Sequence, residues 1–181
     1  MLSTVRRVLP FEYGKYRKHL KSLDAESKIL RFGYTVSDDV IDSLCDSFEN
    51  DPARHILFTI ENSRLEFLAV GHIAIESEME LAFSVLKPYQ GQGMGNQLMA
   101  RCIQWCRTHG ILEGYMVCLS SNVAIKHLCQ KYNIIMAGDT GESMAKIKLD
   151  KANIITYANE ATDDNLAVMD YLGKRAFFPL V

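Results

Sequence analysis

The feature that most constrains the fold is an alternating strand that runs into a glycine-rich turn and then a helix, between residues 79 and 110. In the strand, four apolar residues alternate with one acidic and two small residues, so the two sets lie on opposite faces. The apolar set is Met79, Leu81, Phe83 and Val85, and the other set is Glu80, Ala82 and Ser84. Pro88 cannot donate to a sheet ladder and ends the strand. The second face, with small side chains beside a carboxylate, leaves room for a ligand.

The turn after the strand contains Gly91, Gly93 and Gly95, which allow a backbone so tight that several amide N–H groups can converge. Apolar residues then recur at helical spacing from Leu98 to Cys106, and Gly110 can terminate the run. The first amides of such a helix and the positive end of its dipole favour an anion. The sequence therefore predicts a phosphate-binding turn.

Spacing separates three kinds of glycine-rich phosphate loop. A Walker loop requires Gly-Lys-Ser/Thr, but Asn96 follows Gly95. A Rossmann fingerprint that starts at Gly91 requires glycine or alanine where Asn96 stands, and Glu113 is a poor substitute for the acid that binds ribose. A dinucleotide-dependent enzyme is therefore a distant alternative.

The third pattern is Gln or Arg, two residues, Gly, one residue, and Gly or Ala, which Gln90, Gly93 and Gly95 match. Here the sequence resembles the GNAT family of N-acetyltransferases, which uses this loop for the pyrophosphate of acetyl-CoA. The resemblance continues through residues 117–122 and the following residues, similar to the family's strand that ends in Asn before a helix. Residues 24–32 also look like the helical entry of some bacterial members.

The resemblance implies a mixed α/β fold with a mostly antiparallel, twisted sheet of six to seven strands, flanked by helices. The acetyl-CoA site would lie where two central strands splay apart. Expected strands are 4–9, 55–60, 66–75, the strand from Glu80, a strand ending at 119, 134–137 and 144–149. Expected helices lie within 12–50, with a break at 33–37, and at 94–109 and 122–132.

With 181 residues, 48% of them hydrophobic, the chain can bury one good core. We expect an acetyltransferase domain over residues 1–150 and a C-terminal extension over residues 151–181. The extension would contain a short helix capped near Thr162 and Asp163, packed on the same domain or on a partner in a homodimer. Its inward residues would be Leu166, Met169 and Leu172, and the apolar ending 177–181 would be covered.

The resemblance implies a cofactor site built mainly from backbone groups. Val85, Leu86 and Lys87 would bind the pantetheine arm and help to polarise the thioester carbonyl. Asn122 would touch the same arm. The amides that would hold the pyrophosphate belong to Gln90, Gly91, Gln92, Gly93, Met94, Gly95 and Asn96.

Glu80 matches the strand glutamate that the family uses as general base. A carboxylate is a much weaker base than an amine, so deprotonation would run through water or need burial. Two alternatives remain: an ordinary solvent-facing glutamate at this position, or His72 on the neighbouring strand as the base.

The general acid is less well defined. Many relatives carry a tyrosine seven residues after the position of Asn122, where this chain has Cys129. Tyr132, nearly one helical turn further on, is the candidate acid; Cys129 and solvent are the alternatives. A cysteine on an apolar stripe is first of all a packing residue.

Composition narrows the partners. A formal net charge of −2 without a basic stripe disfavours nucleic acid, and no apolar run is long enough for a membrane span. Five cysteines without a Cys-x-x-Cys pair suit the cytoplasm, and the scattered histidines predict no metal site. The resemblance implies acetyl-CoA-dependent acetylation of a primary amine on a small molecule or protein, and a non-catalytic acyl-CoA sensor is the alternative.

The amine acceptor itself is not specified by the sequence. Four aspartates in one predicted helix either favour a cationic acceptor or form the solvated face of that helix. They are Asp38, Asp39, Asp42 and Asp46.

Overall fold

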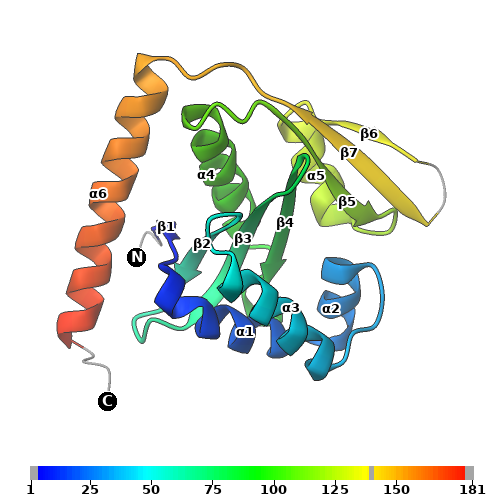
Figure 1. Ribbon diagram of the computed structural model, residues 1–181, viewed down its shortest axis with the longest axis horizontal. Helices are drawn as coiled ribbons and strands as arrows, with labels where there is room; N and C mark the ends of the chain where they lie inside the picture. Colours follow the sequence, from blue (N-terminus) through cyan, green and yellow to red (C-terminus); the bar gives the residue numbers. More distant parts are fainter. Residues whose placement is uncertain (1–3, 139–140, 178–181) are drawn as a thin grey trace.

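The computed structural model describes residues 4–138 and 141–177. Within these residues, seven strands form one sheet in the order β1-β2-β3-β4-β5-β7-β6 (Figure 1). Only the central pair β4–β5 is parallel, and the other pairs are antiparallel. The strands are β1 (Arg6–Arg7), β2 (His55–Glu61), β3 (Phe67–Ile75), β4 (Met79–Val85), β5 (Glu113–Leu119), β6 (Ile135–Ala137) and β7 (Glu142–Lys148). The predicted mixed α/β fold with a mostly antiparallel sheet is confirmed.

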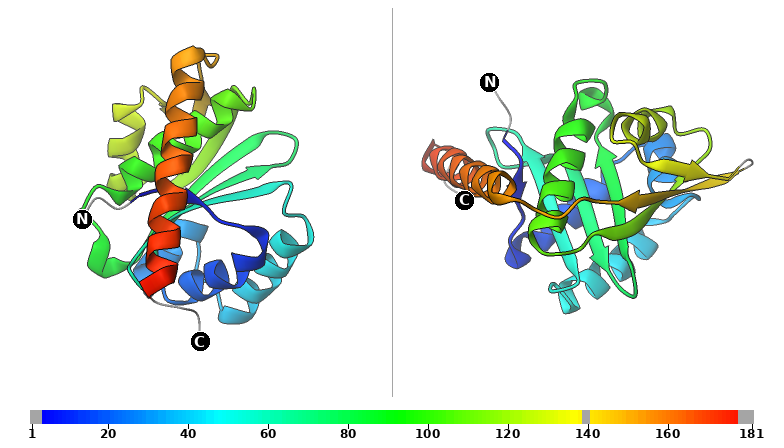
Figure 2. Two further views of the ribbon diagram at one scale, coloured as in Figure 1. Left: turned by 90° about the vertical axis from the view of Figure 1, so that its left-hand side faces the viewer. Right: turned by 90° about the horizontal axis from the view of Figure 1, so that it is seen from above.

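Helices cover both faces of this sheet. The left-hand view of Figure 2 shows α4 on one side and α1 to α3 on the other. The helices are α1 (Tyr13–Lys21), α2 (Ala25–Phe32), α3 (Asp38–Asn50), α4 (Met94–Thr108), α5 (Val123–Lys131) and α6 (Ile154–Phe177), with short 3-10 turns η1 (Pro10–Glu12) and η2 (Lys87–Tyr89). No helix in the described ranges combines the length and the hydrophobicity that a membrane span requires.

Each face of the sheet has its own hydrophobic core. Leu81 and Phe58 pack beneath α4 and α5, whereas Leu57 and Val70 pack beneath α1 and α3. Because β2 and β3 are covered on both faces, β2 is buried along its whole length and β3 along most of it. The central strands are therefore held rigidly, and the cavity described below opens at the edge of β4.

Side chains define where the N-terminal helices begin and end. The Asp24 carboxylate accepts from the Ser27 N–H to start α2, and Gly33, with φ of 83°, ends it. Ser37 caps α3 in the same way, with its hydroxyl accepting from the Val40 N–H. The expected break at residues 33–37 is confirmed, and a second break at residues 22–24 separates α1 from α2.

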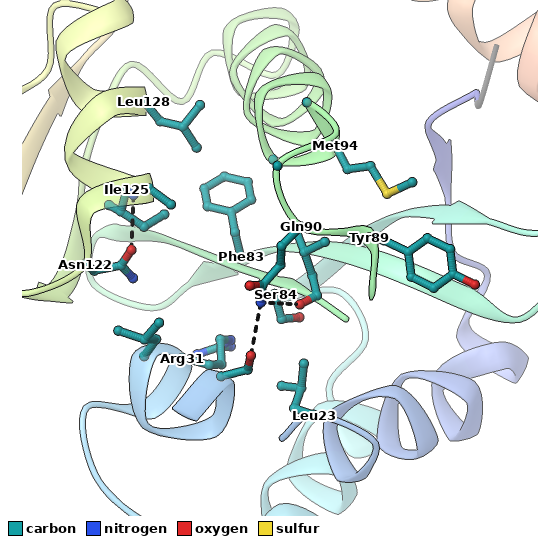
Figure 3. A pocket seen from close by; sticks show the side chains of 17 residues that line it. Leu23, Arg31, Phe83, Ser84, Tyr89, Gln90, Met94, Asn122, Ile125 and Leu128 are labelled. Carbon is teal, nitrogen blue, oxygen red and sulfur yellow. Dashed lines mark hydrogen bonds between the residues drawn. The ribbon is translucent and has the colours of Figure 1, made fainter. Parts of the chain in front are cut away.

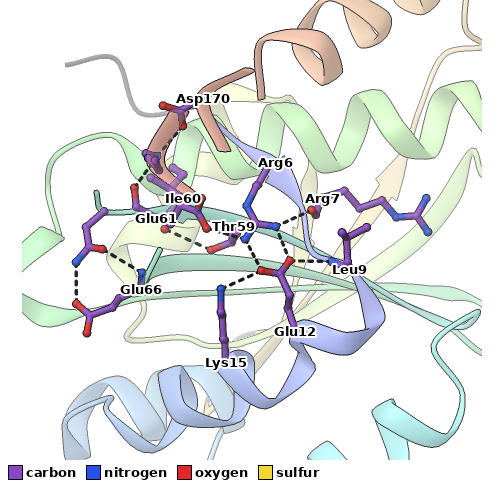
Figure 4. Close-up of polar contacts among 12 residues, drawn as sticks. Arg6, Arg7, Leu9, Glu12, Lys15, Thr59, Ile60, Glu61, Glu66 and Asp170 are labelled. Atoms are coloured by element: carbon purple, nitrogen blue, oxygen red, sulfur yellow. Dashed lines mark hydrogen bonds and ion pairs between the residues drawn. The ribbon is translucent and has the colours of Figure 1, made fainter. Parts of the chain in front are cut away.

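The N-terminal strand is shorter than the expected 4–9 and is held by a buried ion-pair network (Figure 4). The Arg6 guanidinium donates to both carboxylate oxygens of Glu12, at 2.7 and 2.9 Å, and to Glu61 at 2.7 Å. The Lys174 ammonium of α6 reaches the backbone carbonyl of Glu61. This network joins β1, β2 and α6.

The C-terminal extension differs from its prediction. The helix begins at Ile154 rather than near Thr162, because Asn153 and Thr156 bond reciprocally across its first turn. It lies against α4 and β1, as the left-hand view of Figure 2 shows. The residues expected to face inward are 54%, 71% and 55% exposed; they are Leu166, Met169 and Leu172, respectively. Polar contacts determine the docked face instead, and residues 178–181 lie outside the described part of the chain.

Candidate active site

The central strands β4 and β5 separate after a short stretch of pairing. Met79 pairs with Gly114 and Glu80 with Tyr115, and no further pair joins the two strands. Beyond this point β5 continues along β7 as far as Leu119. The second half of β4 therefore borders a wedge-shaped gap, as the family resemblance implied for two central strands.

Backbone groups of β4 point into this gap. The Leu86 N–H donates to the Leu68 carbonyl of β3 at 2.9 Å. In an antiparallel pair, successive residues alternate between facing the partner strand and facing away from it. Phe83 and Val85 therefore direct their backbone N–H and C=O groups toward the side from which β5 has diverged, where a ligand could use them.

The glycine-rich turn leads into a helix start without a side-chain cap. Gly91 and Gly93 adopt φ of 75° and 81°, values that favour glycine. Gly93 is the N-cap of α4, and the first helical bond runs from the Gln97 N–H to its carbonyl. The preceding amides, in residues 94–96, have no helical partner. Such a helix start is suited to bind a phosphate.

A cavity of about 190 Å³ joins this helix start to the wedge (Figure 3). It has the space of roughly six water molecules, which is enough for a slender organic chain. Seven of the predicted cofactor-binding residues line it, namely Val85, Gln90, Gly91, Gly93, Met94, Gly95 and Asn122. The other four do not line it, namely Leu86, Lys87, Gln92 and Asn96.

Side-chain hydrogen bonds hold the turn in place. The Gln90 side-chain amide donates to the Val85 carbonyl and to the Ser27 hydroxyl, both at 3.1 Å. The Gln92 amide donates to the Pro88 carbonyl. Lys87 points outward to the Glu26 carboxylate at 2.6 Å. The conformation of the turn is thus set before any ligand binds.

The predicted base, Glu80, occupies the last position at which β4 and β5 pair. Its side chain is half-buried, and the Tyr115 hydroxyl lies 3.5 Å from its Oε2 atom. His72, the alternative base, is buried between the His55 ring at 3.1 Å and the Arg31 guanidinium at 3.4 Å. Burial, together with the charge of Arg31, lowers the pKa of His72 well below its ordinary value.

The two candidate acids on α5 do not line the cavity. The Tyr132 hydroxyl lies 3.2 Å from both the backbone and side-chain oxygens of Asn96, and burial raises its pKa. Cys129 is fully buried, which raises the pKa of its thiol to about 11. A thiol that stays protonated at neutral pH is a packing group rather than a nucleophile.

Sequence reasoning missed the residues that α1 and α2 contribute. Ser27 and Arg31 of α2 line the cavity, and so does Ser84 of β4. The Ser84 hydroxyl lies 2.9 Å from Nε2 of His19, whose Nδ1 lies 3.0 Å from the Phe67 carbonyl. The sequence contained a signal for Ser84, because this residue lies on the small-residue face of its strand. It contained no signal for His19 and Arg31, because only tertiary packing brings them to this strand.

The chain matches the family model described as the acetyltransferase (GNAT) family over residues 20–133. It therefore belongs to the GNAT acetyltransferase family, in agreement with the resemblance seen in its sequence. The matched segment runs from the end of α1 through α5 and includes the wedge, the turn and the cavity. A search of curated proteins finds no match to the chain.

Solved structures share the fold at low sequence identity. The GNAT domain of S. lividans PAT is 19% identical, with a TM-score of 0.65 over 80% of this chain and 89% of that one. The yncA putative acetyltransferase from Salmonella typhimurium, solved with acetyl-CoA, is 15% identical, with a TM-score of 0.61 over 84% and 96%. The PaiA N-acetyltransferase from Thermoplasma acidophilum, in complex with coenzyme A, is 14% identical, with a TM-score of 0.60 over 82% and 99%.

Proposed function

We propose that the protein transfers the acetyl group of acetyl-CoA to a primary amine of a small molecule or protein, by direct attack within a ternary complex. The main observation in support of this proposal is the cavity that joins the uncapped start of α4 to the gap between β4 and β5. Membership of the acetyltransferase family supports it. Acetyl-CoA and coenzyme A in the yncA and PaiA structures support the identity of the donor.

The residues present fit this donor. A pyrophosphate would lie against the amides at Gly91, Gly93 and the first turn of α4, where glycine leaves no Cβ in the way. The pantetheine arm would follow the wedge, beside the backbone groups of Phe83 and the backbone N–H of Val85, whose carbonyl already accepts from Gln90. Asn122 uses its side-chain oxygen to cap α5, which leaves its NH₂ group for this arm.

Proton transfer needs a base near the end of the wedge. We propose Glu80 for this role, through a water molecule, because its half-buried carboxylate lies where β4 and β5 part. Tyr132 stays the predicted acid, although its hydroxyl contacts Asn96. If the Tyr132→Phe variant had an unchanged kcat, solvent rather than Tyr132 would supply the proton for the departing thiolate.

The Glu80→Gln variant tests the catalytic role. We expect kcat to fall by about 10²-fold or more, while the Kd for acetyl-CoA stays the same, because the carboxylate acts on the amine rather than on the donor. Thiol release measured with a panel of primary amines gives kcat, and calorimetry gives Kd. The control is Glu78→Gln, an exposed carboxylate just before the same strand. Equal kcat in both variants would remove Glu80 from the mechanism.

A non-catalytic acyl-CoA sensor is the second candidate. It is favoured by one observation: neither Tyr132 nor Cys129 lines the cavity. A sensor would bind acetyl-CoA tightly and release no thiol with any amine, whereas the enzyme would release thiol in an amine-dependent way.

We further propose that the protein works in the cytoplasm and forms a homodimer through the outward stripe of α6. Five unpaired, buried cysteines support the reducing compartment. The exposed side chains of Leu166, Met169 and Leu172 support the dimer contact. Sedimentation that gives a monomer at all concentrations would remove the dimer.

A further inference from the structure

Arg31 extends from the last turn of α2 toward the sheet and lines the cavity. Figure 3 shows it on the α2 side of the cavity, near Ser84 and Asn122. Its Nη2 atom lies 3.3 Å from the Tyr16 hydroxyl and 3.4 Å from Nδ1 of His72. These two contacts hold the guanidinium plane in one orientation against the sheet.

This cation lacks a counter-ion. None of the ion pairs in residues 4–138 and 141–177 includes Arg31. Its Nε atom is buried without a hydrogen-bond partner among these residues, and its Nη1 atom makes no hydrogen bond there either. A partly buried guanidinium without a paired anion stabilises an anion that enters the cavity beside it.

Three aspartates of α3 pair with cations of α1 and α2. Asp38 pairs with Lys28 of α2, and Asp42 pairs with Lys21 of α1. Arg17 of α1 contacts Asp46 at 2.6 Å. These carboxylates neutralise cations on their neighbouring helices, and none of them forms an ion pair with Arg31.

Arg31 faces the same side of the sheet as the proposed base. His72, which it contacts, pairs with Ala82 of β4, and Glu80 is two residues from Ala82. Two residues along a strand span about 7 Å. An acceptor with its amine near Glu80 would therefore place a group a few bonds away beside Arg31.

We propose that Arg31 binds a carboxylate of the amine acceptor, so that the substrates are amines that carry a nearby carboxylate. A guanidinium recognises a carboxylate through paired N–H donors. The same charge disfavours polycationic acceptors, because it repels a second ammonium group. This inference rests on the proposed acetyltransferase function and specifies its substrate class.

Matched acceptors test the inference. β-Alanine is propylamine with a carboxylate in place of the terminal methyl group. 4-Aminobutyrate is related to butylamine in the same way. We expect the wild type to acetylate the carboxylated member with at least tenfold higher kcat/KM. Arg31→Gln should reduce this ratio to about one without changing the Kd for acetyl-CoA, and Arg31→Lys should retain part of it. The control is Lys28→Gln, which removes a charge from the same helix outside the cavity and should retain the full ratio.

The outcomes separate this inference from the proposed function. Absence of acetyl-CoA binding in calorimetry would remove both. Binding without acetylation of any amine would also remove both, whereas acetylation of amines with no preference for the carboxylated members would overturn the inference alone. The melting temperature shows whether Arg31→Gln is folded. If the folded variant kept the preference for carboxylated amines, the inference would be overturned. It would also be overturned if the variant lost affinity for acetyl-CoA, because Arg31 would then bind the donor.

Discussion

At the scale of single residues, His19 links three parts of the fold through its two ring nitrogens. Nδ1 donates to the Phe67 carbonyl, so Nε2 is left to accept from the Ser84 hydroxyl at the cavity wall. The ring is almost completely buried, and this burial lowers its pKa to about 4, although the bond to Phe67 acts in the opposite direction. The neutral imidazole is therefore part of the folded structure at physiological pH.

This lowered pKa predicts a pH-dependent stability. The unfolded chain binds a proton at His19 near pH 6.5 and the folded chain only near pH 4, so acidification between these values favours unfolding. We expect this group to lower the free energy of unfolding by up to about 3 kcal/mol across that window, with its full contribution restored above pH 6.5. Urea denaturation at pH 7, 5.5 and 4.5 measures this change in the free energy of unfolding.

The variant His19→Gln should show a shallower decline, while exposed His127→Gln should follow the wild type. An equally steep decline in His19→Gln would show that His19 is not the titrating group.

At the scale of elements, α6 is held by polar contacts rather than by an apolar stripe. Arg101 of α4 is 4% exposed and pairs with Glu160 and Asp164 of α6, above the ring of Phe58. Thr4 donates to Asp170 on the same side of the helix. Glu160 and Asp164 are one helical turn apart, and with Asp170 they explain why a polar side of α6 faces the domain.

Replacing this arginine should release the helix. In Arg101→Leu, Glu160 loses its partner while mostly buried, and we expect the free energy of unfolding to fall by about 3 kcal/mol. Limited proteolysis should cut within α6 sooner, while acetyl-CoA affinity stays unchanged, because α6 does not line the cavity. The control is exposed Arg54→Leu. Protease resistance equal to that of the control would show that other contacts hold α6.

At the scale of the whole molecule, local patterns predicted the order of elements and the turn that opens α4. Alternation in β4, the glycines after it and the break at residues 33–37 are all signals within a few residues. Local patterns could not predict which side of α6 packs on the domain, because that side is determined by contacts with Arg101, more than fifty residues earlier in the sequence. The roles of Arg31 and His19 could not be predicted for the same reason, because they arise only when α1 and α2 fold onto β3 and β4.

The central claim for the molecule is that backbone amides at the start of α4 bind the pyrophosphate of acetyl-CoA. Gly93 has φ of 81° with open space around it, so an added methyl group strains the turn by about 1 to 2 kcal/mol or displaces its amides. Gly173 in α6 also has open space but an ordinary helical backbone, so alanine there should leave the site intact.

Calorimetric titration of acetyl-CoA into the wild type, Gly93→Ala and Gly173→Ala is the most direct test. We expect one site per chain, binding weakened about tenfold in Gly93→Ala, and unchanged affinity in Gly173→Ala. A folded wild type that gives no binding heat, or a Gly93→Ala variant that binds as tightly as the wild type, would contradict the central claim.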